Sequence, residues 1–212
     1  MNARPSPSEE RLLAYAAGTL SPPEAVVVSA CLAMRPDADA WVRRLQGVGG
    51  VILDDLDPMP LQQDALSRAM ARIDADTGEV TAAPPLNDMP ELPEPLRRYP
   101  LGRWRKLGGG VEVRHVHAPR DGDTRVILLR IQPGQATPRH THGGVELTCV
   151  ISGAYAAGNQ PYFPGDFEEA DEDTLHQPRV ISDEPCLCVA ALDGQIILDG
   201  WFGRLIQPFV RL

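Results

Sequence analysis

The chain has no positively charged, then apolar leader at its start, and no run of 18 apolar residues in its 212 positions. Secretory signal peptides need the first feature, and membrane-spanning helices need the second. We therefore expect a protein that is neither secreted nor inserted in a membrane.

Cysteine is scarce as well. The four cysteines, Cys31, Cys149, Cys186 and Cys188, are widely scattered along the chain. Small domains held together by disulfides need more cysteines at closer spacing, so a disulfide scaffold is excluded. A reducing, cytoplasmic compartment is the expected location.

Positive charge is also in short supply, because acidic residues outnumber basic ones and the formal net charge is −9. Proteins that bind nucleic acid directly carry an excess of Lys and Arg on one surface. No direct contact with nucleic acid is therefore expected.

Prolines, by contrast, are abundant and concentrated. Residues 76–100 hold six of the 21 prolines. Such a stretch is typical of an extended linker. We therefore predict a helical domain at residues 1–75 and a second domain at residues 101–212, joined by a Pro-rich linker at 76–100.

The first domain has the apolar periodicity of four short helices, at about residues 6–18, 21–34, 36–50 and 61–73. Ser6 and Ser21 are each followed three residues later by Glu, which is the pattern of an N-terminal capping box. Gly18 and the Gly49–Gly50 pair are the predicted stops. Four short helices make a thin core, so apolar surface is left over for a partner.

After residue 100 the apolar period changes to two, which predicts strands. They are expected near residues 111–117, 124–131, 145–156, 166–170, 176–182, 186–192, 196–200 and 204–210. Many short strands separated by Gly and Pro turns indicate a small jelly-roll barrel. The predicted fold class is thus α+β, with N-terminal helices and a C-terminal β-barrel.

Between residues 134 and 153 the chain reads GQATPRHTHGGVELTCVISG. Side chains alternate along a strand, so His140, His142 and Glu146 point the same way if one unbroken strand carries them. His176 is available as a fourth donor from another strand. Three nitrogens and one oxygen suit zinc, and also iron, manganese, nickel or copper.

This segment resembles the first motif of the cupin superfamily, Gx5HxHx3Ex6G, and fills every position from Gly134 to Gly153. The second cupin motif is matched by the turn Pro164–Gly165–Asp166 and by His176, whereas Val180 stands where Asn is common. The resemblance implies a cupin barrel. The departure at Val180 argues against an enzyme built like the cupin oxygenases.

Taken whole, the chain resembles the ChrR family of bacterial anti-sigma factors. The stretches that resemble the family are LLAYAAGTLSP at 12–22, WRKLGGGV at 104–111, the histidine-containing segment at 134–153, GDFEEADEDTLHQP at 165–178, CLCVAALD at 186–193 and IQPFVRL at 206–212. It implies a protein without catalysis that holds an extracytoplasmic-function sigma factor inactive and releases it under oxidative stress, such as singlet oxygen or organic peroxide. It also implies one zinc ion per chain, on His140, His142, Glu146 and His176.

The helical domain of that family normally binds a second zinc ion. At the corresponding positions this chain has Ser6, Cys31, Arg35 and Ala38, of which only Cys31 could be a ligand. One thiolate cannot build a four-coordinate zinc site. We therefore expect no metal in the N-terminal domain, and we expect sigma binding to be retained because the helix pattern is intact. The alternative is that the domain has lost that role.

Cys186 and Cys188 lie two residues apart on a predicted strand, and hence on one face. They are either small buried core residues or a redox pair whose oxidation loosens the hold on the sigma factor. Candidate sigma contacts are the apolar residues of the predicted helices: Leu12, Tyr15, Val27, Val28, Leu32, Trp41, Leu45, Leu66 and Met70.

Two other classes of function compete with this interpretation. The chain is alternatively a metal-dependent cupin enzyme, such as a dioxygenase, or a sensor of a small ligand, with an accessory helical domain. Glu168, Glu169 and Asp171 precede His176, but such a charge run is expected to be a solvated face. A homodimer formed through the cupin is the alternative to a monomer in a one-to-one complex with the sigma factor.

Overall fold

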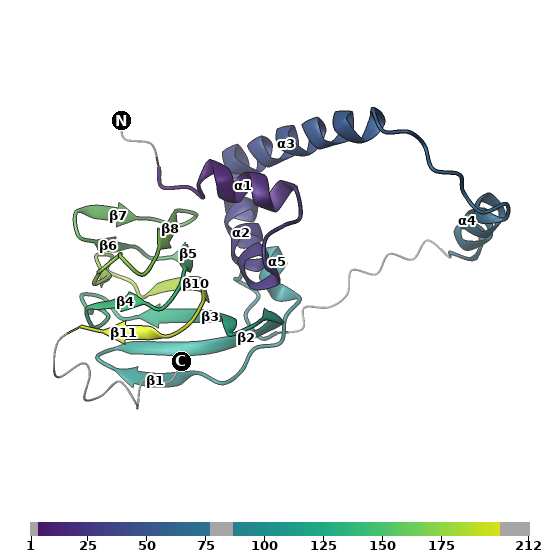
Figure 1. Ribbon diagram of the computed structural model, residues 1–212. Coiled ribbons are helices and arrows are strands. Elements are labelled where there is room, and N and C mark those ends of the chain that lie inside the picture. The colour runs from purple at the N-terminus through teal and green to yellow at the C-terminus, as the bar shows by residue number, and fades with distance from the viewer. Residues whose placement is uncertain (1–3, 77–86, 200–212) are drawn as a thin grey trace.

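The structure is a computed structural model, and it describes residues 4–76 and 87–199. Helices gather on one side of a β-barrel (Figure 1). The helices are α1 (Glu9–Ala16), α2 (Pro22–Met34), α3 (Pro36–Asp54), α4 (Ala65–Ala75) and α5 (Glu94–Arg97). The strands are β1 (Arg105–Gly108), β2 (Val111–Asp121), β3 (Thr124–Ile131), β4 (His140–His142), β5 (Glu146–Ser152), β6 (Tyr155–Ala157), β7 (Gln160–Tyr162), β8 (Phe167–Ala170), β9 (Arg179–Val180), β10 (Cys186–Leu192) and β11 (Ile196–Leu198).

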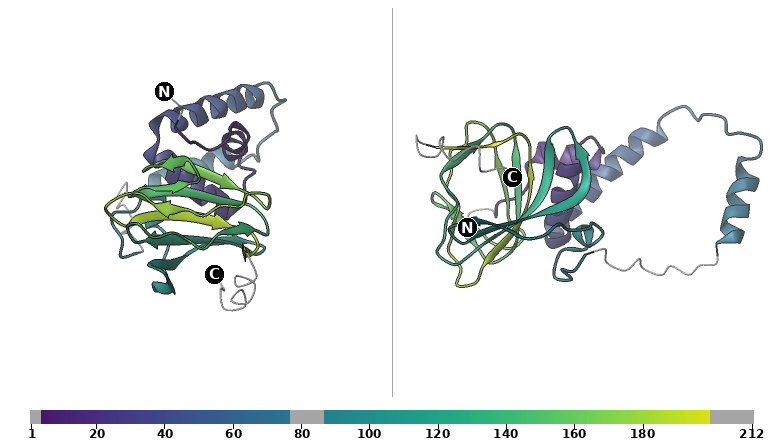
Figure 2. Two further views of the ribbon diagram at one scale, coloured as in Figure 1. Left: turned by 90° about the vertical axis from the view of Figure 1, so that its left-hand side faces the viewer. Right: turned by 90° about the horizontal axis from the view of Figure 1, so that it is seen from below.

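The barrel is built from antiparallel strand pairs, as predicted for a jelly roll. A six-stranded sheet has the order β1-β2-β3-β10-β5-β8, and two smaller sheets have the orders β11-β4 and β7-β6-β9. Figure 2 shows the sheets wrapped around a common interior. The strand predicted at 204–210 lies outside the described residues. The strand predicted at 145–156 is divided by Gly153, whose φ of 69° turns the chain where a Cβ would lie 2.7 Å from the Pro185 carbonyl oxygen.

The helix ends follow the prediction in two cases and depart from it in two. α1 ends at Ala16, just before the predicted stop at Gly18, whose φ is 70°. Ser21 forms the predicted capping box with Glu24 at the start of α2. The cap of α1 is Ser8 and not Ser6, because the Ser8 side chain accepts the Arg11 N–H at 3.3 Å. The stop predicted at Gly49–Gly50 is also wrong: α3 continues to Asp54. Glycine weakens a helix by only about 1 kcal/mol, which does not end one by itself.

α2 is the helix that joins the N-terminal part to the barrel. Its sequence is apolar on nearly every face, which is typical of a helix covered on all sides. Val27, Val28 and Cys31 are fully buried, in one cluster with residues of the six-stranded sheet such as Leu147 and Val189. The helices and the barrel therefore share a hydrophobic core.

The chain before the barrel contributes to the same core. Met89, Leu92 and Leu96 are buried, and α5 packs against α2. The Asn87 side-chain amide donates to the carbonyl oxygens of Leu96 and Tyr99, both at 3.0 Å. For residues 87–100 this packing replaces the extended linker that the prolines predict, because apolar residues recur at helical spacing and are covered by α2. Residues 77–86 lie outside the described part.

α4 differs from the other helices because it has no buried residue. Figure 1 shows it apart from the barrel and from α1, α2 and α3. Within residues 4–76 and 87–199, no helix is both long and apolar enough to cross a membrane.

Candidate metal centre

The four predicted metal ligands come from three places in the barrel. His140 and His142 lie on β4, which pairs with β11, and Glu146 is the first residue of β5 in the six-stranded sheet. The expectation of one unbroken strand is wrong, because the Gly143–Gly144 turn separates β4 from β5. His176 comes from the segment before β9 and exchanges both backbone hydrogen bonds with His140, at 3.0 and 3.1 Å.

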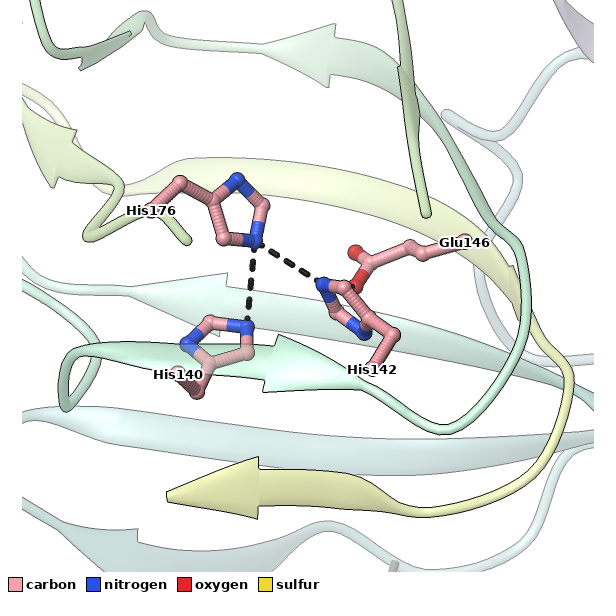
Figure 3. A group of neighbouring side chains, drawn as sticks. All are labelled: His140, His142, Glu146 and His176. Carbon is pink, nitrogen blue, oxygen red and sulfur yellow. Dashed lines mark hydrogen bonds and ion pairs between the residues drawn. The ribbon is translucent and has the colours of Figure 1, made fainter. Parts of the chain in front are cut away.

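These four side chains converge inside the barrel (Figure 3). The Nε2 atom of His176 lies 3.0 Å from that of His142 and 3.2 Å from that of His140. The Nε2 atom of His142 lies 3.1 Å from Oε2 of Glu146. All four ligand atoms lie within 4.8 Å of one another, and the three imidazoles are at most 8% exposed.

The donor set fits a single metal ion. Four ligands at bond lengths of 2.0–2.1 Å around a tetrahedral zinc ion lie about 3.3 Å from one another, close to the separations seen here. The Nδ1 atom of His140 lies 2.7 Å from the Pro138 carbonyl oxygen, which can only accept a hydrogen bond. The ring therefore carries its proton on Nδ1 and presents the Nε2 lone pair to the centre, as a ligand must.

The protonation of His140 and His142 favours metal binding. Burial lowers the pKa of His140 to about 4 and that of His142 to about 3, so both rings are neutral at neutral pH. Burial alone would also lower the pKa of His176. The hydrogen bond and charge of Glu168, together with the charge of Glu146, outweigh burial and raise that pKa. Neutral imidazole is the form that binds a metal.

Glu168 was expected on a solvated face, and that expectation is wrong. It is 8% exposed and points into the barrel, where its Oε1 lies 3.1 Å from Nδ1 of His176. The Tyr155 hydroxyl donates to the other carboxylate oxygen. Asp171, from the same charge run, is exposed as expected. The missed signal was the strand alternation, which places residues 167–170 alternately inside and outside.

A cavity of about 450 Å³ opens beside the quartet formed by His140, His142, Glu146 and His176. Its walls are mostly aliphatic, from β1, β2, β3, β10 and β11, and His140 and Glu146 lie at its polar end. Cavities of this size with a few polar groups are typical of small-molecule sites.

The residues at the positions expected to match the family's helical zinc site make other contacts. Cys31 is buried on α2, with its Sγ 3.5 Å from the Gly165 carbonyl oxygen, and Ala38 is buried in the core. The Arg35 guanidinium donates to both Asp37 carboxylate oxygens, at 2.8 and 2.6 Å, and to the Pro5 carbonyl oxygen at 3.0 Å. Within the described residues, the group of side chains placed to hold a metal ion is the quartet in the barrel.

Cys186 and Cys188 lie side by side on β10, with their sulfur atoms 3.7 Å apart. Both are buried among apolar residues of β2, β3 and β5. The hydrogen bond with Cys186 and burial raise the pKa of the Cys188 thiol well above its usual value. A buried thiol that stays protonated reacts slowly with oxidants, so this setting favours a core role.

The residues predicted to contact a sigma factor are divided by the fold. Leu12, Val28 and Leu32 are buried in the shared core, and burial removes them from the surface. Tyr15 and Leu45 are half-buried, and Trp41 is 40% exposed. Of the others, Val27 is buried, whereas Leu66 and Met70 are exposed on α4. The sequence also did not single out the exposed apolar residues at the end of α3.

A β-barrel with three inward imidazoles and one glutamate, covered on one side by N-terminal helices, defines a cupin-type protein with an added helical part. Residues 101–194 match the family model described as the ChrR cupin-like domain. The chain is 36% identical to the anti-sigma-E factor ChrR of Cereibacter sphaeroides, over the full length of both.

It is also similar to a chain in the crystal structure of Rhodobacter sphaeroides SigE in complex with the anti-sigma ChrR. The identity is 35% and the TM-score is 0.78, over 91% of this chain and all of that one. The protein therefore belongs to the ChrR family of anti-sigma factors.

Proposed function

We propose that this protein binds an extracytoplasmic-function sigma factor through its helical part and keeps it from RNA polymerase. The cupin holds one zinc ion on His140, His142, Glu146 and His176 and acts as the sensor. Oxidative stress, such as singlet oxygen or organic peroxide, alters the cupin and releases the sigma factor.

The observation that carries this proposal is the exposed apolar surface of two separate elements, the end of α3 and α4. The residues are 49–73% exposed: Val48, Val51, Ile52 and Leu53 at the end of α3, Leu56 just after it, and Leu66, Met70 and Ile73 on α4. On α4 they recur at helical spacing and form one stripe. Exposed clusters of large apolar residues like these mark sites for a protein partner. The similarity to a chain crystallised with SigE supports a sigma factor as that partner.

Inhibition then works by competitive masking. The apolar stripe of α4 and the end of α3 bury surface against sigma segments that must otherwise contact RNA polymerase. Interfaces of this type depend on a few large apolar residues at their centre. No catalytic step is needed for this function.

The metal supports regulation and not catalysis. Zinc with four protein ligands is the arrangement of structural sites, whereas catalytic zinc sites keep one position open for water or substrate. When bound, the ion would fix the positions of the three imidazoles and Glu146. The site is close to the sheet on which α2 packs, so a change there reaches the helices through the shared core.

Coexpression with the sigma factor, followed by gel filtration and metal analysis of the complex, tests this proposal. We expect a stable one-to-one complex with one zinc ion per anti-sigma chain. Treatment with an organic hydroperoxide is expected to release the sigma factor. A chain that never copurifies with a sigma factor contradicts the proposal.

The cavity favours a second candidate function, the sensing of a small apolar ligand. A ligand with an apolar body and one oxygen donor would place the donor near His140 and Glu146 and the body among the aliphatic walls. Calorimetric titration with decanoate tests this function. Ala190→Leu, which narrows the cavity, is expected to abolish binding. If the variant releases the same heat of binding as the parent protein, the ligand does not bind in this cavity.

A further inference from the structure

Strand β8 faces the quartet with one side and the helices with the other. Glu168 points into the barrel, whereas Glu169 and the Asp166 carboxylate, just before the strand, meet residues of the N-terminal part. For Glu168 and Glu169 this follows from the alternation of side chains along a strand, whereas Asp166 belongs to the turn before β8. The same short segment therefore contacts both the candidate metal centre and the helical part.

On the inner side, Glu168 positions His176. Its Oε1 lies 3.1 Å from Nδ1 of His176, and the Tyr155 hydroxyl fixes its other oxygen. A carboxylate that accepts a hydrogen bond from Nδ1–H leaves Nε2 free for a metal and fixes the plane of the ring. Glu168 is thus a positioning residue, since it acts on the quartet through His176.

On the outer side, Glu169 holds the start of α1. Its carboxylate accepts the backbone N–H of Ser8 at 2.8 Å and the Ser8 hydroxyl at 3.3 Å, and lies 3.7 Å from the Arg11 guanidinium. Ser8 is the N-cap of α1, so the strand fixes the residue at which that helix begins. The backbone of β8 takes part as well, because the N–H of Phe167 donates to the Pro5 carbonyl oxygen at 3.3 Å.

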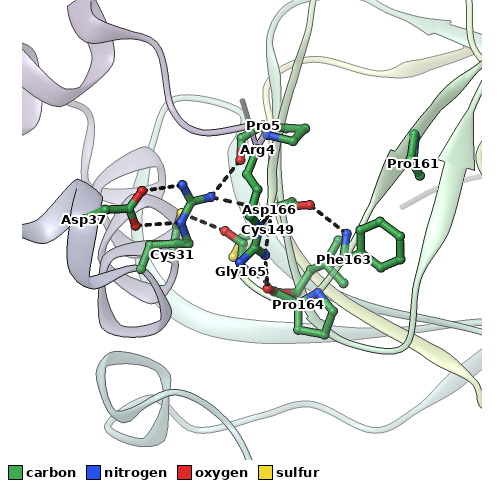
Figure 4. Close-up of polar contacts among 12 residues, drawn as sticks. Arg4, Pro5, Cys31, Asp37, Cys149, Pro161, Phe163, Pro164, Gly165 and Asp166 are labelled. Atoms are coloured by element: carbon green, nitrogen blue, oxygen red, sulfur yellow. Dashed lines mark hydrogen bonds and ion pairs between the residues drawn. The ribbon is translucent and has the colours of Figure 1, made fainter. Parts of the chain in front are cut away.

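Asp166 adds a buried ionic contact at the same boundary (Figure 4). Its side chain is 1% exposed; the Arg4 Nε donates to it at 2.8 Å and the Arg35 guanidinium lies 3.5 Å away. Arg35 also donates to the Pro5 carbonyl oxygen. Residues 4–8 are therefore clamped between α3 and the turn that leads into β8.

We infer that β8 couples the occupancy of the metal centre to the docking of α1 and residues 4–8. The inference rests on the proposed metal site. With an ion bound, His176 is fixed, and through Glu168 it holds β8 in the position in which Glu169 and Asp166 bind the helical part. Without the ion, the Nε2 atoms of His140 and His176, which lie 3.2 Å apart, lose the shared metal that would join them, and the His176 side chain is held less firmly. The helical part that carries the sigma-binding surface then loses a fixed attachment.

Coupling of this kind is reciprocal: the ion strengthens docking by the same factor by which docking strengthens the binding of the ion. A coupling free energy changes the two equilibria by about 5-fold or more. The docking of α1 and the affinity for the ion can both be measured on the full chain without the sigma factor.

The test is hydrogen–deuterium exchange of the full chain, with zinc bound and after removal of zinc by a chelator, next to a zinc titration. We expect removal of zinc to speed exchange in residues 4–17 by about 5-fold or more. In Glu169→Gln, which weakens the outer contact, exchange in α1 is expected to be fast with or without zinc. Glu172→Gln, an exposed carboxylate of the same acidic segment, is the matched control and is expected to behave as the parent protein.

Asp166→Asn provides a second variant on the outer side and is expected to lose the zinc dependence as Glu169→Gln does. If the parent protein binds one zinc ion and exchange in α1 does not respond to it, the inference is overturned while the proposed metal site stands. If zinc does not bind at all, the titration itself shows it, and both the inference and the proposed sensor fail.

Discussion

Arg35 of the helical part and Asp166 of the barrel meet in a buried contact, with Nη1 3.5 Å from Oδ1 and side chains 7% and 1% exposed. Arg35 stands at one of the positions expected, from the resemblance to the ChrR family, to match a helical zinc ligand. An arginine, with its five donors, joins Asp37, Pro5 and Asp166 at that place. The contact ties α3 to the turn before β8.

Arg35→Met is expected to lower the free energy of unfolding by about 3 kcal/mol, because it leaves a buried carboxylate with one partner fewer. The matched control is Arg43→Met, which removes an exposed ion pair with Asp39 and is expected to cost less than about 1 kcal/mol. Urea denaturation of both variants measures the difference. Equal losses would show that the buried contact adds no more stability than an exposed ion pair.

Tyr155→Phe is expected to lower the free energy of unfolding by about 1–3 kcal/mol, because the buried Glu168 carboxylate loses its hydroxyl donor. Zinc affinity is expected to fall as well, since Glu168 positions His176. Tyr162→Phe is the control. The Tyr162 ring stacks on that of Tyr155, with ring centroids 4.9 Å apart, and the phenylalanine ring of the variant keeps this contact. Zinc affinity that is the same in both variants contradicts the positioning role.

Stability is expected to fall above pH 10. Burial raises the pKa of Tyr162 to about 12, and it also raises the pKa of Tyr155 well above its usual value. An unfolded tyrosine ionises near pH 10, so above that pH the unfolded state has lost protons that the folded state retains, and the free energy of unfolding decreases. Denaturation at pH 9, 10 and 11 measures the slope. Tyr162→Phe should make it shallower, and an unchanged slope argues against a raised pKa for Tyr162.

The α4 stripe is expected to carry much of the sigma affinity. Replacing Leu66 and Met70 with Asp should weaken the complex by about 30-fold or more, the effect of losing a contact worth 2 kcal/mol at the centre of an interface. Folding should be unaffected, because both residues are exposed. Ile181→Asp, an exposed residue of the barrel, is the control. Titration calorimetry with the sigma factor measures both affinities, and equal values would remove α4 from the interface.

The thiols of the folded protein are expected to resist alkylation. All four cysteines are buried, and the pKa values of Cys149 and Cys188 are raised by thiol hydrogen bonds and burial. Iodoacetamide labelling should be slow in buffer and fast in urea, as mass spectrometry would show. Rapid labelling of Cys186 or Cys188 in the folded protein would favour the redox pair over the core role.

The quartet could be predicted because its chemistry is local. Three of its members lie within seven residues, and the spacing survives the turn at Gly143–Gly144 that the strand prediction missed. Glu168 could not be predicted in the same way. Glu168 and Glu169 are identical in type and adjacent, and only their place on an edge strand sends one inside and the other to α1.

The helices show a similar limit. Apolar spacing predicted α2 and its cap, but it could not say that the barrel covers the helix. For that reason Val28 and Leu32 were candidates for a partner although the sheet buries them. The cap of α1 depends on Glu169, about 160 residues away, and no local pattern contains that contact.

X-ray absorption at the zinc edge, on the chain purified with its sigma factor, tests the central claim most directly. The account predicts one zinc ion per chain with three nitrogens and one oxygen at about 2.0–2.1 Å. A sulfur ligand at about 2.3 Å would contradict it by placing zinc on a cysteine, and so would a complex that contains no metal.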